Sequence, residues 1–208
     1  MFPGLVGRVR FWCLMSRVLV ACECSGRVRD AFIKEGHDAM SCDLLPTMSP
    51  GPHYQGDIFD LLAADSDWDL MIAHPPCTYL SSSGIHWNNR GRGWADTNAA
   101  LLFVQKLDSL NIPHIAIENP VGILSTRLRK PSQYIQPWQY GHPESKKTCL
   151  WLKNLPLLVP THILTPTQFT IKGTPQWDNQ TSSGQNKIGP SAHRDMIRSL
   201  TYQGWADA

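Results

Sequence analysis

Short apolar segments separated by polar turns set the pattern of the first part of the chain. Residues 17–21 (RVLVA) form a β-branched apolar run, which predicts a buried strand. A helix-like stretch covers residues 28–35 and stops at Gly36. Further buried strands are expected at residues 39–42 and 69–73. Each expected strand is followed by a polar or proline-containing turn.

The middle of the chain repeats this alternation with a longer helix. Residues 97–110 show the helical period, followed by expected strands at 114–117 and 148–152. The apolar side of the expected helix consists of Ala100, Phe103, Val104, Leu107 and Leu110. Strands that alternate with helices indicate an α/β fold with a doubly wound, mostly parallel sheet. In such sheets ligands bind at the carboxyl ends of the strands.

Composition is typical of one globular domain. The chain has 208 residues, of which 42% are hydrophobic and 17% charged, and its formal net charge is +2. This charge gives no broad electrostatic field, so a nucleic acid would have to be held by local basic patches. No apolar run is long enough to predict a membrane span. The six cysteines are expected to be reduced thiols of a cytoplasmic protein.

Four segments are expected along the chain. Residues 1–14 are apolar and basic without a cleavage site, and we expect a disordered or loosely docked extension. Residues 15–152 carry the alternating strands and helices of the main domain. Residues 153–189 are rich in Pro, Thr, Gln, Asn and Ser, which indicates a loop-rich segment. Residues 190–208 are expected to return to the main domain.

Two strand ends carry residues suited to catalysis. After residues 69–73 comes Pro75-Pro76-Cys77, a stiff turn that can hold a thiol at the ligand edge. After residues 114–117 comes Glu118, whose carboxyl could act as a general acid if burial raises its pKa. Taken singly, a packing cysteine and a solvated glutamate are the more common explanations.

The turn after the first strand is a candidate ligand site. It contains Glu23, Ser25 and Gly26, and with its single glycine it lacks the G-x-G-x-x-G dinucleotide pattern. It can still admit a small ligand beside a helix N-terminus. Asp43 ends the second strand and is placed to accept hydrogen bonds from ribose hydroxyls. Asp57, in the sequence Gly-Asp-Ile, is by itself most simply a turn residue.

In chain order, these motifs resemble the DNA cytosine-5 methyltransferase family from about residue 17 to near the C-terminus. Residues 18–26 (VLVACECSG) resemble the first S-adenosylmethionine motif, PPC the nucleophile motif and ENP at 118–120 the base-binding motif. The resemblance implies a Rossmann-like methyltransferase fold and S-adenosylmethionine as cofactor. The cofactor contacts that it implies are Cys22, Glu23, Ser25, Gly26, Asp43 at the ribose, Asp57 at the adenine amino group, and Pro75.

The chemistry that the resemblance implies is transfer of a methyl group to C5 of cytosine in DNA. Cys77 would add to C6 as a thiolate, and a protonated Glu118 would hydrogen bond N3 and contact the exocyclic amine. No metal is required. Amino-group methyltransferases instead use Asp/Asn-Pro-Pro-Tyr/Phe. His74 and Cys77 stand at those two positions here, so carbon methylation fits better.

Substrate contacts are expected in two further places. The stretch 81–93 follows the nucleophile and could close over a flipped base, with Arg90 and Arg92 on phosphates and Trp87 stacking. An ordinary solvated loop is about as frequent. Lys146 and Lys147 stand where the family usually has Gln-x-Arg-x-Arg. The substrate-contact residues are therefore Pro76, Ser81, Ser82, Arg90, Arg92, Asn119, Pro120, Lys146 and Lys147.

The chain departs from the family in length. Residues 153–189 stand in place of a large target-recognition region, as in a compact, phage-type member. Two substrates therefore remain open: DNA with a short or relaxed sequence preference, or a free cytosine nucleotide, which needs no base flipping. A non-catalytic module that binds the cofactor or a nucleic acid is the third alternative. Neither the recognised sequence nor the oligomeric state can be predicted.

Overall fold

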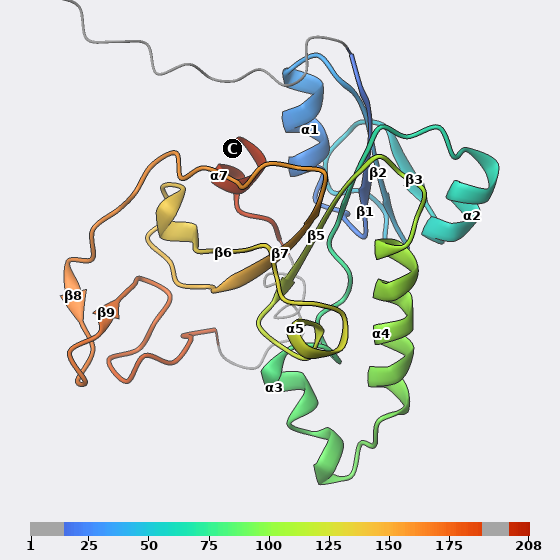
Figure 1. Ribbon diagram of the computed structural model, residues 1–208. Helices are drawn as coiled ribbons and strands as arrows, with labels where there is room; N and C mark the ends of the chain where they lie inside the picture. The colour runs from blue at the N-terminus through green and yellow to red at the C-terminus, as the bar shows by residue number, and fades with distance from the viewer. Residues whose placement is uncertain (1–14, 189–199) are drawn as a thin grey trace, which may run out of the picture.

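A seven-stranded sheet with helices on both faces organises the chain (Figure 1). The computed structural model describes residues 15–188 and 200–208. The elements are β1 Arg17–Ala21, α1 Arg27–Lys34, β2 Asp38–Asp43, β3 His53–Gln55, α2 Ile58–Ala64, β4 Leu70–Ala73, α3 Ser82–Ile85, the 3-10 turn η1 Asn88–Arg90, α4 Ala95–Asp108, β5 His114–Pro120, α5 Leu124–Arg127, β6 Gln133–Ile135, the 3-10 turn η2 Pro137–Gln139, β7 Thr148–Lys153, β8 Gln168–Phe169, β9 Pro175–Gln176 and α7 Gln203–Ala206.

The strand order is β3-β2-β1-β4-β5-β7-β6. The first five strands in this order are parallel, and β7 runs antiparallel to both β5 and β6. The chain leaves β1 toward β2 and β3 on one side, and returns to β4 and β5 on the other. The prediction of a doubly wound, mostly parallel sheet is confirmed.

Apolar side chains on the two faces of the sheet belong to two hydrophobic clusters. In β1, Val18 and Val20 belong to a cluster with Val28 of α1, whereas Leu19 belongs to the cluster on the opposite face, with Val104 of α4. Successive side chains of a strand point to opposite faces, so a wholly apolar run is what a strand covered on both faces requires.

The length of β5 differs from the sequence expectation. The expected strand stops at residue 117, where the parallel pairing with β4 also stops, at Ala73↔Ile117. On its other edge β5 continues with β7, pairing Glu118↔Leu150 and Pro120↔Thr148. Glu118 and its two successors therefore lie within the strand and not after it. The residues near 118 do not indicate this continuation, because the partner strand comes much later in the chain.

The stretch 81–93 is also more ordered than the solvated loop that was one alternative. It contains α3 and η1, and the Ser81 side chain caps α3 by accepting from Gly84 N. The elements missed from the sequence are short ones, chiefly β3, α2 and β6, which have too few residues to display a period.

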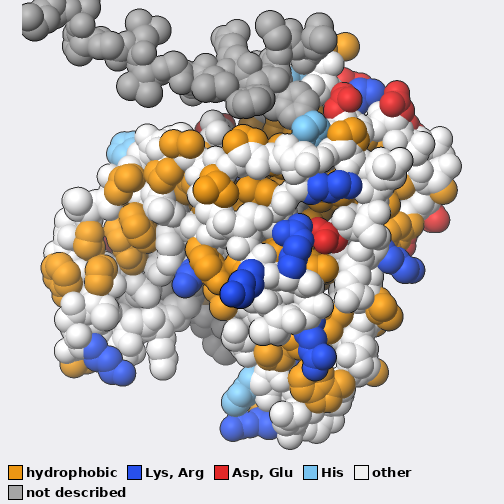
Figure 2. Space-filling view, in the orientation of Figure 1, with side chains coloured by type: hydrophobic (Ala, Val, Ile, Leu, Met, Phe, Trp, Pro, Cys, Tyr) orange, Lys and Arg blue, Asp and Glu red, His pale blue; other side chains and the backbone are white. Residues whose placement is uncertain are grey.

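The structure of the segment that follows β7 is as irregular as its composition indicates. Within 154–188 the structure shows two-residue strands, β8 and β9, and otherwise isolated bridges, turns and irregular loop. Large apolar side chains are exposed there, and orange side chains gather over this part of the molecule in Figure 2. The exposed members are Leu157, Val159, Ile163, Phe169 and Ile171.

The end of the chain packs against the main sheet. Trp205 of α7 lies in a cluster with Ile135, Tyr140 and Leu150, and α7 also contacts α1. The expected extension at 1–14 and the start of the C-terminal segment, 189–199, lie outside the described residues. The four-part division of the chain therefore stays a prediction. None of the described helices is long and apolar enough to cross a membrane.

Candidate functional site

A cavity opens at the carboxyl ends of the strands, where the winding direction changes between β1 and β4. Such a switch point is where ligands bind in open α/β sheets. Its volume is about 410 Å³, within the usual range for small-molecule sites. It is lined by Cys22, Cys42, Asp43, Leu44, Gly56, Asp57, Ile58, Pro75, Pro76, Tyr79, Leu80, Asp96, Ala99, Ala100 and Phe103.

All charged side chains that line this cavity are acidic. Asp43, Asp57 and Asp96 contribute carboxyl groups, and no lysine or arginine is found among the described residues that line it. Most other lining side chains are apolar. A ligand with a positive charge, hydrogen-bond donors and an apolar ring system fits this lining, whereas the phosphates of a dinucleotide would be repelled.

The two acids expected at the cofactor are held by local structure. Asp43 ends β2, and its Oδ1 accepts a hydrogen bond from Leu45 N at 2.9 Å. Asp57 is the N-cap of α2, where its side chain accepts from Phe59 N at 2.7 Å. One carboxylate oxygen of each residue is thereby fixed by the backbone, which orients the other oxygen of the same group.

Cys22 lines the cavity in a strained conformation. Its φ angle is 58°, in the left-handed region that non-glycine residues seldom adopt. Burial, followed by the nearby Asp43 carboxylate, raises the pKa of the Cys22 thiol to about 12. Burial and the Asp43 carboxylate also raise the pKa of Cys42 to about 12. Both thiols therefore stay protonated near neutral pH and are poor nucleophiles.

Three residues expected at the cofactor are not brought into this cavity. Glu23 is buried, and its Oε1 accepts hydrogen bonds from Ser25 Oγ and, at 3.0 Å, from Arg27 N at the start of α1. Its Oε2 is buried without a hydrogen-bond partner among the described residues. Gly26 adopts φ 78°, and its position would bring a Cβ atom to 2.5 Å from the Arg29 guanidinium.

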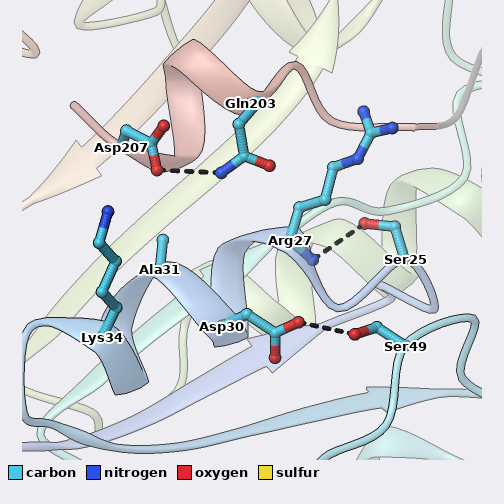
Figure 3. A pocket seen from close by; sticks show the side chains of 8 residues that line it. All are labelled: Ser25, Arg27, Asp30, Ala31, Lys34, Ser49, Gln203 and Asp207. Atoms are coloured by element: carbon cyan, nitrogen blue, oxygen red, sulfur yellow. Dashed lines mark hydrogen bonds between the residues drawn. The ribbon is translucent and has the colours of Figure 1, made fainter.

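Ser25 instead lines a second hollow, between α1 and α7 (Figure 3). The polar groups there largely bond one another: Asp30 accepts from Ser49 Oγ at 2.8 Å, and Gln203 donates to Asp207 at 2.9 Å. The figure shows no set of polar groups turned toward a common point. We assign no ligand to this hollow.

The Pro75-Pro76-Cys77 turn and the end of β5 are joined by two side-chain contacts. Asn119 Nδ2 donates to Pro75 O at 2.7 Å, in a buried position. His74 Nδ1 lies 3.2 Å from Glu118 Oε2. Pro75 and Pro76 line the cavity, whereas Cys77 and Glu118 are not among its lining residues. Partly buried Cys77 thus lies one residue beyond the cavity wall and within the turn that Asn119 holds.

Glu118 has the opposite ionisation tendency from the one that a general acid needs. Burial raises the pKa of its carboxyl, but the His74 hydrogen bond and the Lys146 cation lower it more, so that the net pKa lies below the ordinary value. The condition stated for a general acid, a pKa raised by burial, is therefore not met in the unliganded protein. Its Oε1 is buried without a hydrogen-bond partner among the described residues.

The residues expected to contact phosphates or the base differ in whether their side chains already make contacts within the protein. Arg92 donates to Asn88 Oδ1 and to Gly84 O, both at 2.6 Å, and lies over the Tyr79 ring. It therefore braces the stretch 81–93 internally. Arg90 and Trp87 are exposed. Ser82 Oγ, expected at the substrate, donates to Val121 O at 3.0 Å, next to Pro120.

The two lysines before β7 lie at the same end of the sheet as Pro120, which pairs with Thr148. Lys146 Nζ lies 5.7 Å from the ring centres of Tyr202 and Trp205, and Lys147 Nζ lies 4.3 Å from that of Tyr134. Figure 2 shows Lys and Arg side chains spread over the face that carries β5, β7 and α5. This is a local basic surface on a chain of small net charge.

Sequence reasoning missed the wall that α4 contributes. Ala100 and Phe103 were assigned to the apolar side of the expected helix, but Asp96 and Ala99 were not considered. The apolar period indicates that a helix face is buried, without saying whether a sheet or a ligand covers it. His74 served only to exclude amino-group methylation, and no sequence signal linked it to Glu118.

Comparison with known proteins gives structural similarity alone. No family model and no curated protein matches the chain. Similar solved structures include an E. coli protein described as a prophage-encoded DNA modification methyltransferase (14% identity, TM-score 0.46, 73% of this chain and 53% of that one). Others are the Dnmt2 methyltransferase of S. pombe (20%, 0.45, 69% and 50%) and the methyltransferase EhMeth of Entamoeba histolytica (13%, 0.46, 73% and 58%). The chain spans about half the length of these proteins.

Proposed function

We propose that this protein transfers a methyl group from S-adenosylmethionine to C5 of cytosine in DNA, with Cys77 as the nucleophile. The observation that carries the proposal is the pair of contacts from Asn119 to Pro75 and from Glu118 to His74. They join a proline-stiffened thiol turn to a carboxyl on the neighbouring strand, at the edge of a ligand cavity.

The cavity supports the choice of cofactor. S-adenosylmethionine carries a positive sulfonium, an ammonium group, ribose hydroxyls and an adenine ring, and it lacks phosphate. Asp43 and Asp57 supply carboxylates for the hydroxyls and the amino group, and Ile58 and Phe103 offer apolar surface for the ring. When bound, this cofactor supplies an electrophilic methyl group.

The side chains beside the cavity would carry the remaining steps. Addition of the Cys77 thiolate to C6 breaks the C5=C6 double bond and makes C5 nucleophilic. The carboxylate of Glu118 accepts a hydrogen bond from the exocyclic amine, which orients the ring. After C5 has taken the methyl group, loss of its proton and expulsion of the thiolate restore the aromatic base.

A free cytosine nucleotide is the second candidate substrate, and one observation favours it. The described part of the segment after β7 consists of irregular loop, turns and two-residue strands, without a lobe able to embrace a duplex. The basic surface over β5, β7 and α5 favours DNA, because the phosphate backbone supplies most of the affinity of such complexes.

The test is a substrate panel with labelled S-adenosylmethionine and duplex DNA, single-stranded DNA or dCMP. We expect label in the DNA, and a stable adduct on DNA that contains 5-fluorocytosine. Cys77→Ser should abolish both. Cys24→Ser is the matched control, since Cys24 is also partly buried and is in the turn after β1. Label only in dCMP would contradict the DNA substrate, and no label or adduct would contradict methyl transfer.

A further inference from the structure

His74 is fixed in place by both neighbouring strands. Its backbone N donates to Ala21 O at the end of β1 at 2.9 Å, and Pro75 and Pro76 stiffen the chain after it. The side chain is 11% exposed. One ring nitrogen, Nδ1, lies 3.2 Å from Glu118 Oε2. The other, Nε2, is buried and without a hydrogen-bond partner among the described residues.

This contact divides the roles of the two Glu118 oxygens. Oε2 faces His74, so Oε1 keeps its capacity for a further hydrogen bond. An ionised carboxylate accepts hydrogen bonds and donates none. It therefore pairs with the exocyclic amine of cytosine and is repelled by the carbonyl oxygen that uracil carries at the same position.

The surroundings of Glu118 determine whether it stays ionised. The titratable or charged groups that act on it are His74 after β4, Lys146 before β7, and Cys149 within β7. The nearby hydroxyl of Thr148, which does not titrate in this range, also lowers the pKa of the carboxyl. Of these groups, His74 makes the largest contribution that favours the ionised form.

We propose that His74 is a positioning residue that holds Oε2 of Glu118 through Nδ1–H, leaving Oε1 as an acceptor for the amine of cytosine. The inference rests on the proposed function and adds a determinant of base selection to it. This positioning role involves no change in covalent bonds and no additional reactant.

The experiment compares wild type, His74→Ala, His74→Asn and the control His114→Asn. His114 begins β5 at the opposite edge of the sheet, where its ring contacts Asn154 O. For His74→Ala we expect kcat on cytosine DNA to fall at least about tenfold, with unchanged affinity for S-adenosylmethionine. Preference for cytosine over uracil in the same DNA should also fall. The acid limb of the pH–rate profile should move to higher pH, because Glu118 loses a group that lowers its pKa.

His74→Asn retains a donor near the Nδ1 position and should restore most of the rate and the base preference. A His74→Ala enzyme with wild-type kcat, pH profile and base preference would overturn this inference, while loss of activity in Cys77→Ser would leave the proposed function standing. If wild type is inactive on every substrate, the proposed function fails. In that case, carbon-13 NMR titration of the Glu118 carboxyl in wild type and His74→Ala tests the His74–Glu118 contact directly. Identical titration curves would exclude an influence of His74 on Glu118.

Discussion

At the scale of single residues, Glu118 shows how neighbours override burial. A buried carboxyl by itself favours the neutral form, and the sequence offered no reason to expect otherwise. His74 and Lys146 come from two other strand ends and reverse the outcome. Both act through space, so residue spacing along the chain could not reveal the sign of the shift.

This shift predicts an effect on acid stability. The folded pKa of Glu118 lies below its value of 4.5 in the unfolded chain, so the carboxylate adds stability above that pH and the contribution is lost as the pH falls. Between about pH 5 and pH 3, the free energy of unfolding of Glu118→Gln should fall less steeply than that of wild type. Urea titrations across this range measure the slopes. Equal slopes would contradict the lowered pKa.

Arg29 is a fully buried cation that organises the loop before β3. Its guanidinium donates to Ser41 Oγ, Ser49 O and Pro50 O, and pairs with Asp30. The loop closes around it so tightly that a Cβ atom on Gly51, whose φ is 152°, would lie 2.8 Å from the guanidinium.

Arg29→Met should therefore destabilise the protein by about 3 kcal/mol or more, because it leaves buried carbonyl groups without donors. Lys34→Met, an exposed change on the same helix, should alter stability by less than about 0.5 kcal/mol. Denaturant unfolding at neutral pH compares the two variants. A similar small effect for both would show that the loop does not depend on the buried cation.

At the scale of elements, the long helices and strands were predicted from the sequence, and so was the place of polar residues at strand ends. The apolar run of β1 and the apolar period of α4 are visible in the sequence because each element is long enough to display its own pattern. Short α2 and three-residue β3 owe their conformation to partners distant in sequence. Asp43 and Asp57 were found because strand ends and turns are visible in the sequence, whereas the positions of Asp96 and His74 depend on tertiary packing.

Asp57 is the N-cap of α2 and also lines the cavity, and variants can separate these two roles. Asp57→Ala should remove the N-cap of α2, costing about 1 kcal/mol, and should weaken binding of S-adenosylmethionine. Asp57→Ser retains a capping oxygen but loses the charge, so stability should stay near wild type while binding still weakens. Thermal unfolding and calorimetric titration measure the two effects. Full cofactor affinity in Asp57→Ser would exclude a role of the carboxylate in the cavity.

At the scale of the whole molecule, the last residues complete a third hydrophobic cluster, in which Trp205 packs with Ile135, Tyr140 and Leu150. Trp205 packs between β6, β7 and the preceding turn. A Cβ atom on Gly204 would lie 2.0 Å from Tyr140 O, so only glycine permits this approach. The chain end is thereby built into the domain near the lysines that precede β7.

Trp205→Ala should cost about 3 kcal/mol or more, as expected for a large buried aromatic side chain. Trp87→Ala is the matched control, because Trp87 is 55% exposed and should change stability little. Chemical denaturation of both variants provides the measurement. If Trp205→Ala unfolds like wild type, the C-terminal helix does not contribute to the cooperative fold.

The one-signed charge of the cavity has a consequence for turnover. The proposed donor enters as a sulfonium cation and leaves as an uncharged thioether. The carboxylates of the cavity would attract the cationic donor at long range more strongly than the uncharged product, while the proposed contacts of Asp43 and Asp57 to hydroxyl and amino groups would stay the same. The proposed reaction would thereby remove part of the electrostatic attraction that brings the donor to the cavity.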